Sequence, residues 1–245
     1  MNYKNFLYIL FACCLLTTFS SCSISARIKR ADKRYAIGEY YQAAEMYKQV
    51  SRNIKGKEKS IRAYVAFQQA ECYRVLNNKR AANLYKNAIR YNYPDSIVYL
   101  RYAQVLQYQG KYKDAAEQYN IYLATHPNDY VAMAGKYACS QVDTWRKQPS
   151  RYKISPANEF NAKRSSNFAP AFTSEDGDAL IFTSNRQEQK SSTKKKVRTS
   201  SVTGMPSFNL YSARKNAAGK WEEIELCEGL YAETEAEDGE GTQKQ

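Results

Sequence analysis

Small and large apolar residues recur with helical spacing between residues 24 and about 142. Three segments align with one another: AIGEYYQAAEMYKQV (36–50), VLNNKRAANLYKNAI (75–89) and YQGKYKDAAEQYNIYL (108–123). In each, a turn-forming Gly or Asn precedes a short polar stretch and then Ala-x-x-x-Tyr, which places a small and a large residue on one helical face. The pattern predicts consecutive helix–turn–helix units.

The residues of these units have distinct physical roles. Gly38 and Gly110 allow a turn with positive φ at no steric cost. Pro94 and Pro127 are expected to end the second helices, because proline lacks the N–H donor and restricts the residue before it. The repeated small–large pairs are Ala43 with Tyr47, Ala81 with Tyr85, and Ala115 with Tyr119.

With Ala70 and Ala103 upstream, this spacing resembles the tetratricopeptide (TPR) repeat, a helix–turn–helix of 34 residues. Residues 22–142 are therefore expected to form a helical solenoid, closed by a helix over 130–142. The resemblance implies a protein-binding groove lined by the first helix of each repeat, although some of its tyrosines could instead cover the helix packing. The groove positions on this chain are Tyr64, Phe67, Glu71, Arg74, Leu100, Arg101, Gln104 and Tyr108.

The helical period is predicted to stop at Asp143, and residues 143–166, with two prolines, are interpreted as a linker. An extended stretch at 169–172, an acidic-Gly turn at 175–178 and a β-rich run at 179–184 then predict a hairpin. Residues 207–229 supply two further strands around a turn at 216–219. The polar, basic stretch 187–206 between them is interpreted as a disordered excursion.

The stretch NFAPAFTSEDGDALIFTSNR (167–186) resembles the WD40-like PD40 motif of TolB and related periplasmic propellers. Residues 167–245 would then be one incomplete blade, whereas a propeller typically closes with four to eight. The expected fold class is mainly α: a TPR helical solenoid followed by an incomplete PD40-type β-propeller blade.

The N-terminal apolar run, residues 6–16, is too short to span a bilayer, which needs about 20 residues. Residues 1–21 are therefore interpreted as a signal peptide. The sequence Phe19-Ser20-Ser21-Cys22 resembles the lipobox of bacterial lipoproteins, which implies cleavage before Cys22 and acylation of its thiol. The alternative is cleavage by the ordinary signal peptidase, which would make Cys22 incidental.

After processing, Cys72, Cys139 and Cys227 remain, and their odd number and irregular spacing indicate neither a disulfide framework nor a zinc site. Cys72 and Cys139 are expected to pack as small apolar residues.

The formal net charge is +13, and it is distributed unevenly along the chain. Residues 222–240 hold nine acidic side chains and no basic one, so residues 1–220 carry about +21. The segment 24–142 has 20 Lys/Arg against 9 Asp/Glu. Such a field favours polyanions or an anionic membrane face, and the export signal argues against nucleic acid. We expect the basic first helix to be attracted to lipid headgroups.

The order of lipobox, TPR repeats and PD40 motif resembles the PorE-like outer-membrane lipoproteins of the type IX secretion machinery of Bacteroidetes. The resemblance implies a palmitate-bearing, lipid-anchored scaffold in the outer membrane that binds protein partners of a secretion or envelope complex. Residues 23–26 lack an acidic cluster, which implies that the protein faces the periplasm. Peptidoglycan binding would require the OmpA-family domain of longer members, so the chain is interpreted as truncated at its C-terminus.

No catalytic constellation, cofactor motif or metal site is predicted. His126 is the single histidine and precedes Pro127 without a residue to orient it, so a histidine-based triad is excluded. Three alternatives stay open. One is a SusD-like glycan-binding lipoprotein, which saccharide-dependent quenching of tryptophan or tyrosine fluorescence would reveal, and another is a TolB-like envelope-integrity protein. The third is an exported propeller hydrolase, which would need a nucleophile and a base beyond residue 245.

Overall fold

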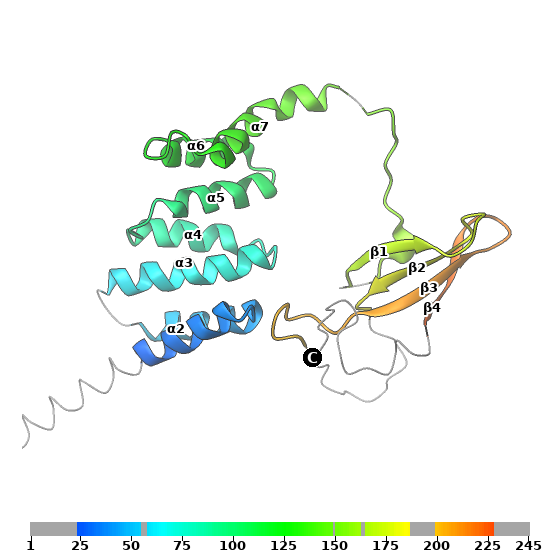
Figure 1. Ribbon diagram of the computed structural model, residues 1–245, viewed down its shortest axis with the longest axis horizontal. Helices are drawn as coiled ribbons and strands as arrows, with labels where there is room; N and C mark the ends of the chain where they lie inside the picture. Colours follow the sequence, from blue (N-terminus) through cyan, green and yellow to red (C-terminus); the bar gives the residue numbers. More distant parts are fainter. Residues whose placement is uncertain (1–23, 55–57, 149, 163–164, 187–198, 228–245) are drawn as a thin grey trace, which may run out of the picture. The chain divides into compact units, whose positions relative to one another are not determined.

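The computed structural model describes residues 24–54, 58–148, 150–162, 165–186 and 199–227. These residues form two compact units (Figure 1): a helical unit that ends at Ser150 and includes Ser201–Thr203, and a sheet unit made of the remaining residues from Arg151 onward. Cys22, the predicted lipid site, and most of the acidic C-terminal segment lie outside the described residues. No helix in the described part is long and apolar enough to cross a membrane.

Successive helices of the helical unit pack on one another in chain order, and α5 also contacts α7 (Figure 1). Helical residues 24–36, here called the N-terminal helix, precede the first labelled helix. The others are α2 (Tyr40–Asn53), α3 (Lys59–Val75), α4 (Ala81–Arg90), α5 (Ile97–Tyr108), α6 (Tyr112–Leu123) and α7 (Tyr130–Arg146). A mainly helical unit of helix pairs, as the repeat pattern predicts, is therefore confirmed.

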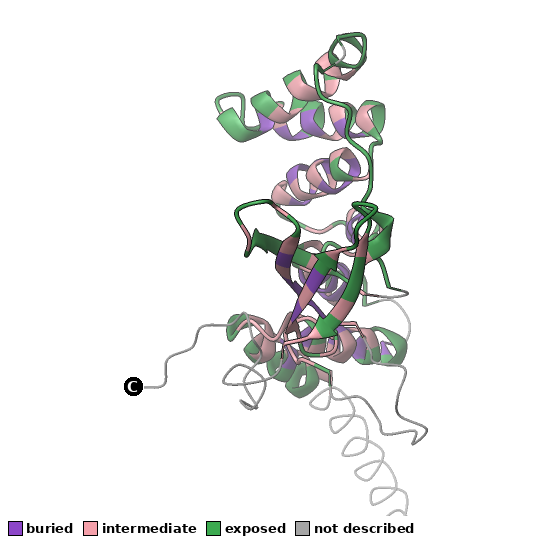
Figure 2. Cartoon of the chain, turned by 90° about the vertical axis from the view of Figure 1, so that its right-hand side faces the viewer, coloured by how far each residue is buried: buried purple, intermediate pink, exposed green. Residues whose placement is uncertain are grey.

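The small–large pairs form the core of each helix pair, where buried residues lie between neighbouring helices (Figure 2). Ala43, Tyr47, Ala81, Tyr85 and Ala115 have no exposed surface, and Tyr119 is 2% exposed. On α7, Gly135 completes the last of these contacts, since a Cβ at this position would lie 2.4 Å from Cζ of Tyr119. Absence of a side chain at Gly135 thus lets α7 approach α6.

Turns between paired helices use the left-handed conformation. Gly38 and Gly110 have φ of 82° and 76°, as predicted. The second repeat lacks the glycine, and Asn77 takes its place with φ of 50°, because asparagine tolerates this region better than most residues. Helix α4 ends at Arg90, where Asn92 adopts φ of 60°. This turn, and not the later Pro94, ends the helix.

Two boundaries differ from the sequence prediction. Helix α7 continues to Arg146, four residues beyond the expected end of the solenoid at 142. The presumed linker 143–166 also contains a short 3-10 helix, η1 (Asn158–Phe160), whose Phe160 ring packs edge-on against Phe182 with centroids 5.3 Å apart. Part of the predicted linker therefore belongs to the core of the sheet unit.

The sheet unit is a four-stranded antiparallel sheet in the order β1-β2-β3-β4. Its strands are β1 (Asn167–Phe172), β2 (Ala179–Ser184), β3 (Asn209–Lys215) and β4 (Trp221–Leu226). Both predicted hairpins are present, with Gly177 (φ 65°) and Gly219 (φ 75°) in their turns. Leu180, Phe182, Tyr211 and Ala213 form a small core.

Candidate partner-binding groove

The eight predicted groove residues divide into buried and accessible groups. Phe67, Glu71 and Leu100 are only 6–8% exposed, so most of each side chain lies in the packing between helices. The sequence pattern did not reveal this, because one helical face serves both packing and groove. The accessible or partly accessible positions are Tyr64, Arg74, Arg101, Gln104 and Tyr108.

Glu71 is the centre of a buried polar network that joins α3, α4 and α5. Its Oε1 accepts a hydrogen bond from the Tyr85 hydroxyl. Its Oε2 lies 2.7 Å from Nη2 of Arg74, and Nε of Arg101 lies 3.9 Å from Oε1. Burial and the Glu71 charge raise the pKa of Tyr85. Burial alone would lower the pKa of Arg74, but Glu71 outweighs it and the pKa is raised. The network therefore keeps Arg74 in its charged form and holds the guanidinium groups of Arg74 and Arg101 beside one buried carboxylate.

Tyr64 has a structural contact as well. Its hydroxyl donates to Oδ1 of Asp32 at 3.0 Å, and the Tyr47 hydroxyl donates to the same oxygen at 2.5 Å. Burial and the hydrogen bond to Asp32 raise the pKa of Tyr64 to about 12. Tyr64 therefore fits the alternative interpretation, in which a tyrosine covers the helix packing.

Two adjacent cavities share Gln104 and Tyr108, and together they define the groove from here on. The smaller, ≈ 160 Å³, lies between α3 and α5 and is also lined by Arg74. The larger, ≈ 670 Å³, lies between α5 and α7 and is also lined by Trp145 and Arg146. Arg74, Gln104 and Tyr108 are therefore brought together as predicted. Arg101 instead donates from Nη1 to Oε1 of Gln104 at 3.2 Å and holds that amide in place.

The sequence prediction missed the contribution of α6 and the end of α7. Trp145 is 51% exposed, and the Arg146 guanidinium lies 5.6 Å from the centroid of the Tyr112 ring. The helical spacing of Ala138, Val142 and Trp145 indicates that the helix continues beyond residue 142 and brings Trp145 to the same face. The predicted end of the solenoid at 142 excludes Trp145. The open groove is thus aromatic and cationic, the two residue classes most enriched at binding hot spots.

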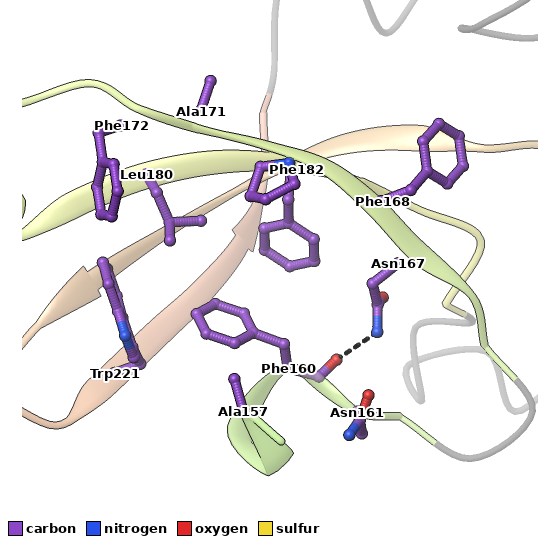
Figure 3. A pocket seen from close by; sticks show the side chains of 11 residues that line it. Ala157, Phe160, Asn161, Asn167, Phe168, Ala171, Phe172, Leu180, Phe182 and Trp221 are labelled. Carbon is purple, nitrogen blue, oxygen red and sulfur yellow. Dashed lines mark hydrogen bonds between the residues drawn. The ribbon is translucent and has the colours of Figure 1, made fainter. Parts of the chain in front are cut away.

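The sheet unit holds a second concave site, an aromatic pocket of ≈ 420 Å³ (Figure 3). The Phe172 and Trp221 rings flank Leu180, while Phe160 faces Phe182. Asn167 donates from Nδ2 to the Phe160 carbonyl at 2.9 Å, whereas its buried Oδ1 has no hydrogen-bond partner among the described residues. The pocket suits an apolar or stacking group.

Titratable side chains in the described part form no catalytic arrangement that we can identify. His126 stacks on Tyr122 with centroids 4.5 Å apart, and its Nδ1 lies 2.9 Å from the Thr125 hydroxyl. Burial raises the pKa of the Cys72 thiol to about 12, which makes it a poor nucleophile at neutral pH. In the described part of the chain, no group of three or more His, Cys, Asp or Glu residues lies close enough together to hold a metal ion.

Comparison with known proteins gives limited matches. No family profile and no curated protein sequence matches the chain. Among solved structures, the second TPR domain of human RPAP3 in complex with an HSP70 peptide is 16% identical, with a TM-score of 0.43, over 49% of this chain and 98% of that one. The first TPR of Spaghetti (RPAP3), bound to an HSP90 peptide, is 18% identical with the same TM-score, over 49% and 93%.

Proposed function

We propose that this protein is a non-catalytic scaffold that binds a protein partner through the groove. The observation that supports this is the pair of cavities sharing Gln104 and Tyr108, with Arg74 on one side and Trp145 and Arg146 on the other. Tyr108 is 70% exposed, although other residues of the same helix, such as Ala103 and Leu106, are buried in the core. A preformed surface of this kind lowers the ordering cost of binding.

Charge indicates the kind of partner segment. Arg146 faces the larger cavity, and Arg74 lines the smaller one beside the Glu71 network. Among the described residues, no Asp or Glu lines either cavity. We infer an extended or helical peptide segment with an aromatic or aliphatic anchor and at least one carboxylate.

Anchoring and location belong to the same proposal. The lipobox-like sequence ending at Cys22 supports attachment to the outer membrane on its periplasmic side. The lipobox-like sequence is followed along the chain by the repeats and then by the PD40-like hairpins, and this order supports a role in type IX secretion or envelope assembly. The four-stranded sheet would then be one blade of a propeller.

A test of the groove compares envelope proteins that co-purify with the wild-type chain and with a Tyr108→Ala/Trp145→Ala variant. Losing two exposed aromatic anchors should reduce capture of a groove partner at least about tenfold, since each hot spot contributes about 1–2 kcal/mol. Ile121→Ala is the matched control, because Ile121 is 46% exposed on α6 and lines neither cavity. Equal capture by both variants would exclude the groove as the binding surface.

Anchoring is tested by mass spectrometry of the mature protein from a bacterial membrane fraction. The expected N-terminal residue is Cys22 carrying a diacylglyceryl thioether. Cys22→Ser should abolish the modification and release the protein from the membrane. Cleavage at another position, or an unmodified thiol, would contradict the anchoring proposal and leave the groove proposal standing.

The aromatic pocket favours glycan binding as a second candidate function. Phe172 and Trp221 present ring faces to a cavity that also contains the amides of Asn161 and Asn167. Sugars stack their apolar faces on aromatic rings and bond amides through hydroxyl groups. Quenching of Trp221 fluorescence by saccharides would favour this candidate.

A further inference from the structure

A cationic cavity of ≈ 490 Å³ lies between the N-terminal helix and the C-terminal turns of α2, away from the groove. We call it the arginine pocket. Its lining combines three exposed arginines, two side-chain amides and two apolar residues: Arg27, Arg30, Arg52, Gln49, Asn53, Met46 and Val50.

The three arginines have no carboxylate partner among the described residues, in contrast to Arg34 and Arg74. Arg34 lies 2.7 Å from Glu39, and Arg74 lies 2.7 Å from Glu71. By contrast, no ion pair to Arg27, Arg30 or Arg52 occurs among the described residues. In the part of the chain that the structure describes, no Asp or Glu lines the pocket either.

This arrangement has an electrostatic cost in the absence of a ligand. Arg27 and Arg30 are three residues apart on one helix, where side chains are neighbours and like charges repel. Arg52, in the last turn of α2, brings a third cation to the same cavity. An anion in the pocket would relieve this repulsion.

Phosphate is the anion that the pocket suits best. Guanidinium groups bind phosphate oxygens through paired hydrogen bonds, and they do so more specifically than ammonium groups. Gln49 adds an amide that can donate to an oxygen, while the Asn53 amide already donates from Nδ2 to the Gln49 carbonyl at 2.8 Å. Val50, 1% exposed, and the half-buried Met46 provide an apolar floor. A cationic rim over such a floor suits a phosphate ester that carries an apolar portion.

We propose that the arginine pocket binds the phosphate of an anionic phospholipid headgroup. The choice of lipid over free phosphate rests on the proposed anchoring: Arg27 follows Cys22 by five residues, a span of at most about 18 Å even when fully extended. The pocket therefore lies within reach of the headgroup layer to which Cys22 would be attached. Occupancy of the pocket would fix the orientation of the helical unit on the membrane.

The test is binding of the full chain to vesicles of phosphatidylcholine with and without phosphatidylglycerol. Replacing the three arginines together (R27Q, R30Q and R52Q) should weaken binding to the anionic vesicles at least about tenfold. Each cation close to an anionic membrane surface adds to the electrostatic attraction, and the variant loses three of them. Binding to pure phosphatidylcholine should be the same for the wild-type chain and the variant. Residues 1–22 are identical in both, so they cannot account for a difference between them.

A charge-matched control separates a site from a general field. Lys86, Lys113 and Lys136 are exposed, lie on α4, α6 and α7, and make no ion pair among the described residues. Their combined change to Gln removes the same charge and should lower affinity no more than about threefold, since screening limits distant charges. An equal loss of affinity for anionic vesicles in the arginine and lysine variants would contradict a specific site at the arginine pocket.

Competition distinguishes the ligand sources. Glycerol phosphate should displace the wild-type chain from anionic vesicles more effectively than chloride at equal ionic strength, and equal displacement would overturn phosphate recognition. If the arginine variant lost inorganic phosphate binding but kept vesicle binding, the lipid assignment would be wrong. The helical circular dichroism of the triple arginine variant should match that of the wild type, and unchanged partner capture keeps this test separate from that of the groove.

Discussion

Replacing Glu71 by alanine is expected to lower the free energy of unfolding of the helical unit by about 3–5 kcal/mol, because it breaks a buried ion pair at one partner. The Tyr85 hydroxyl, which belongs to a side chain with no exposed surface, would lose its acceptor. Arg74 and Arg101 would face each other without the carboxylate between them. Urea unfolding followed by helical circular dichroism measures the change.

Two variants separate the causes of this loss. Glu71→Gln keeps the volume and an acceptor for Tyr85 but removes the charge, so we expect a smaller loss of about 1–2 kcal/mol. Glu45→Ala removes the Lys48 pair at 2.9 Å, in which both side chains are 35% exposed, and should cost at most about 0.5 kcal/mol. If Glu71→Ala were no more harmful than Glu45→Ala, the network would not join the helices as described.

The second large effect is expected for Tyr47→Ala, at about 3–5 kcal/mol, the range for truncating a buried aromatic side chain. Tyr47 has no exposed surface and packs beside Ala43 and Ala44 between the N-terminal helix, α2 and α3. Its removal would leave a cavity that the surrounding helices cannot fill.

Tyr47→Phe is the matched control for this prediction. It keeps the ring and removes one of two hydroxyl donors to Asp32, since Tyr64 still donates at 3.0 Å. The expected loss is about 1 kcal/mol. A loss for Tyr47→Phe as large as that for Tyr47→Ala would mean that the hydrogen bond to Asp32, and not ring packing, dominates this contact.

Local pattern predicted much of the fold. The Ala-x-x-x-Tyr spacing placed Ala81 and Tyr85 correctly in the core, and the acidic-Gly turn placed Gly177 in a hairpin. These features depend on residues three to eight apart, where helical and hairpin geometry fix which side chains meet.

Features that depend on distant contacts were not predictable in this way. Phe160 lies in a polar stretch with no strand or helix pattern, and its partner Phe182 is provided by a different element. Glu71 appears as an ordinary groove residue, because its burial depends on Tyr85 and Arg101 from later helices. Three of the eight predicted groove positions are buried for the same reason, while Gln104 and Tyr108 line both cavities.

Binding through the groove is tested most directly by a photo-crosslinking amino acid at position 108 of the membrane-anchored protein. We predict a crosslink to one envelope protein from position 108, its loss when Trp145 is changed to alanine, and no such product from position 121 on α6. Crosslinking from position 121 but not from position 108 would contradict binding through the groove.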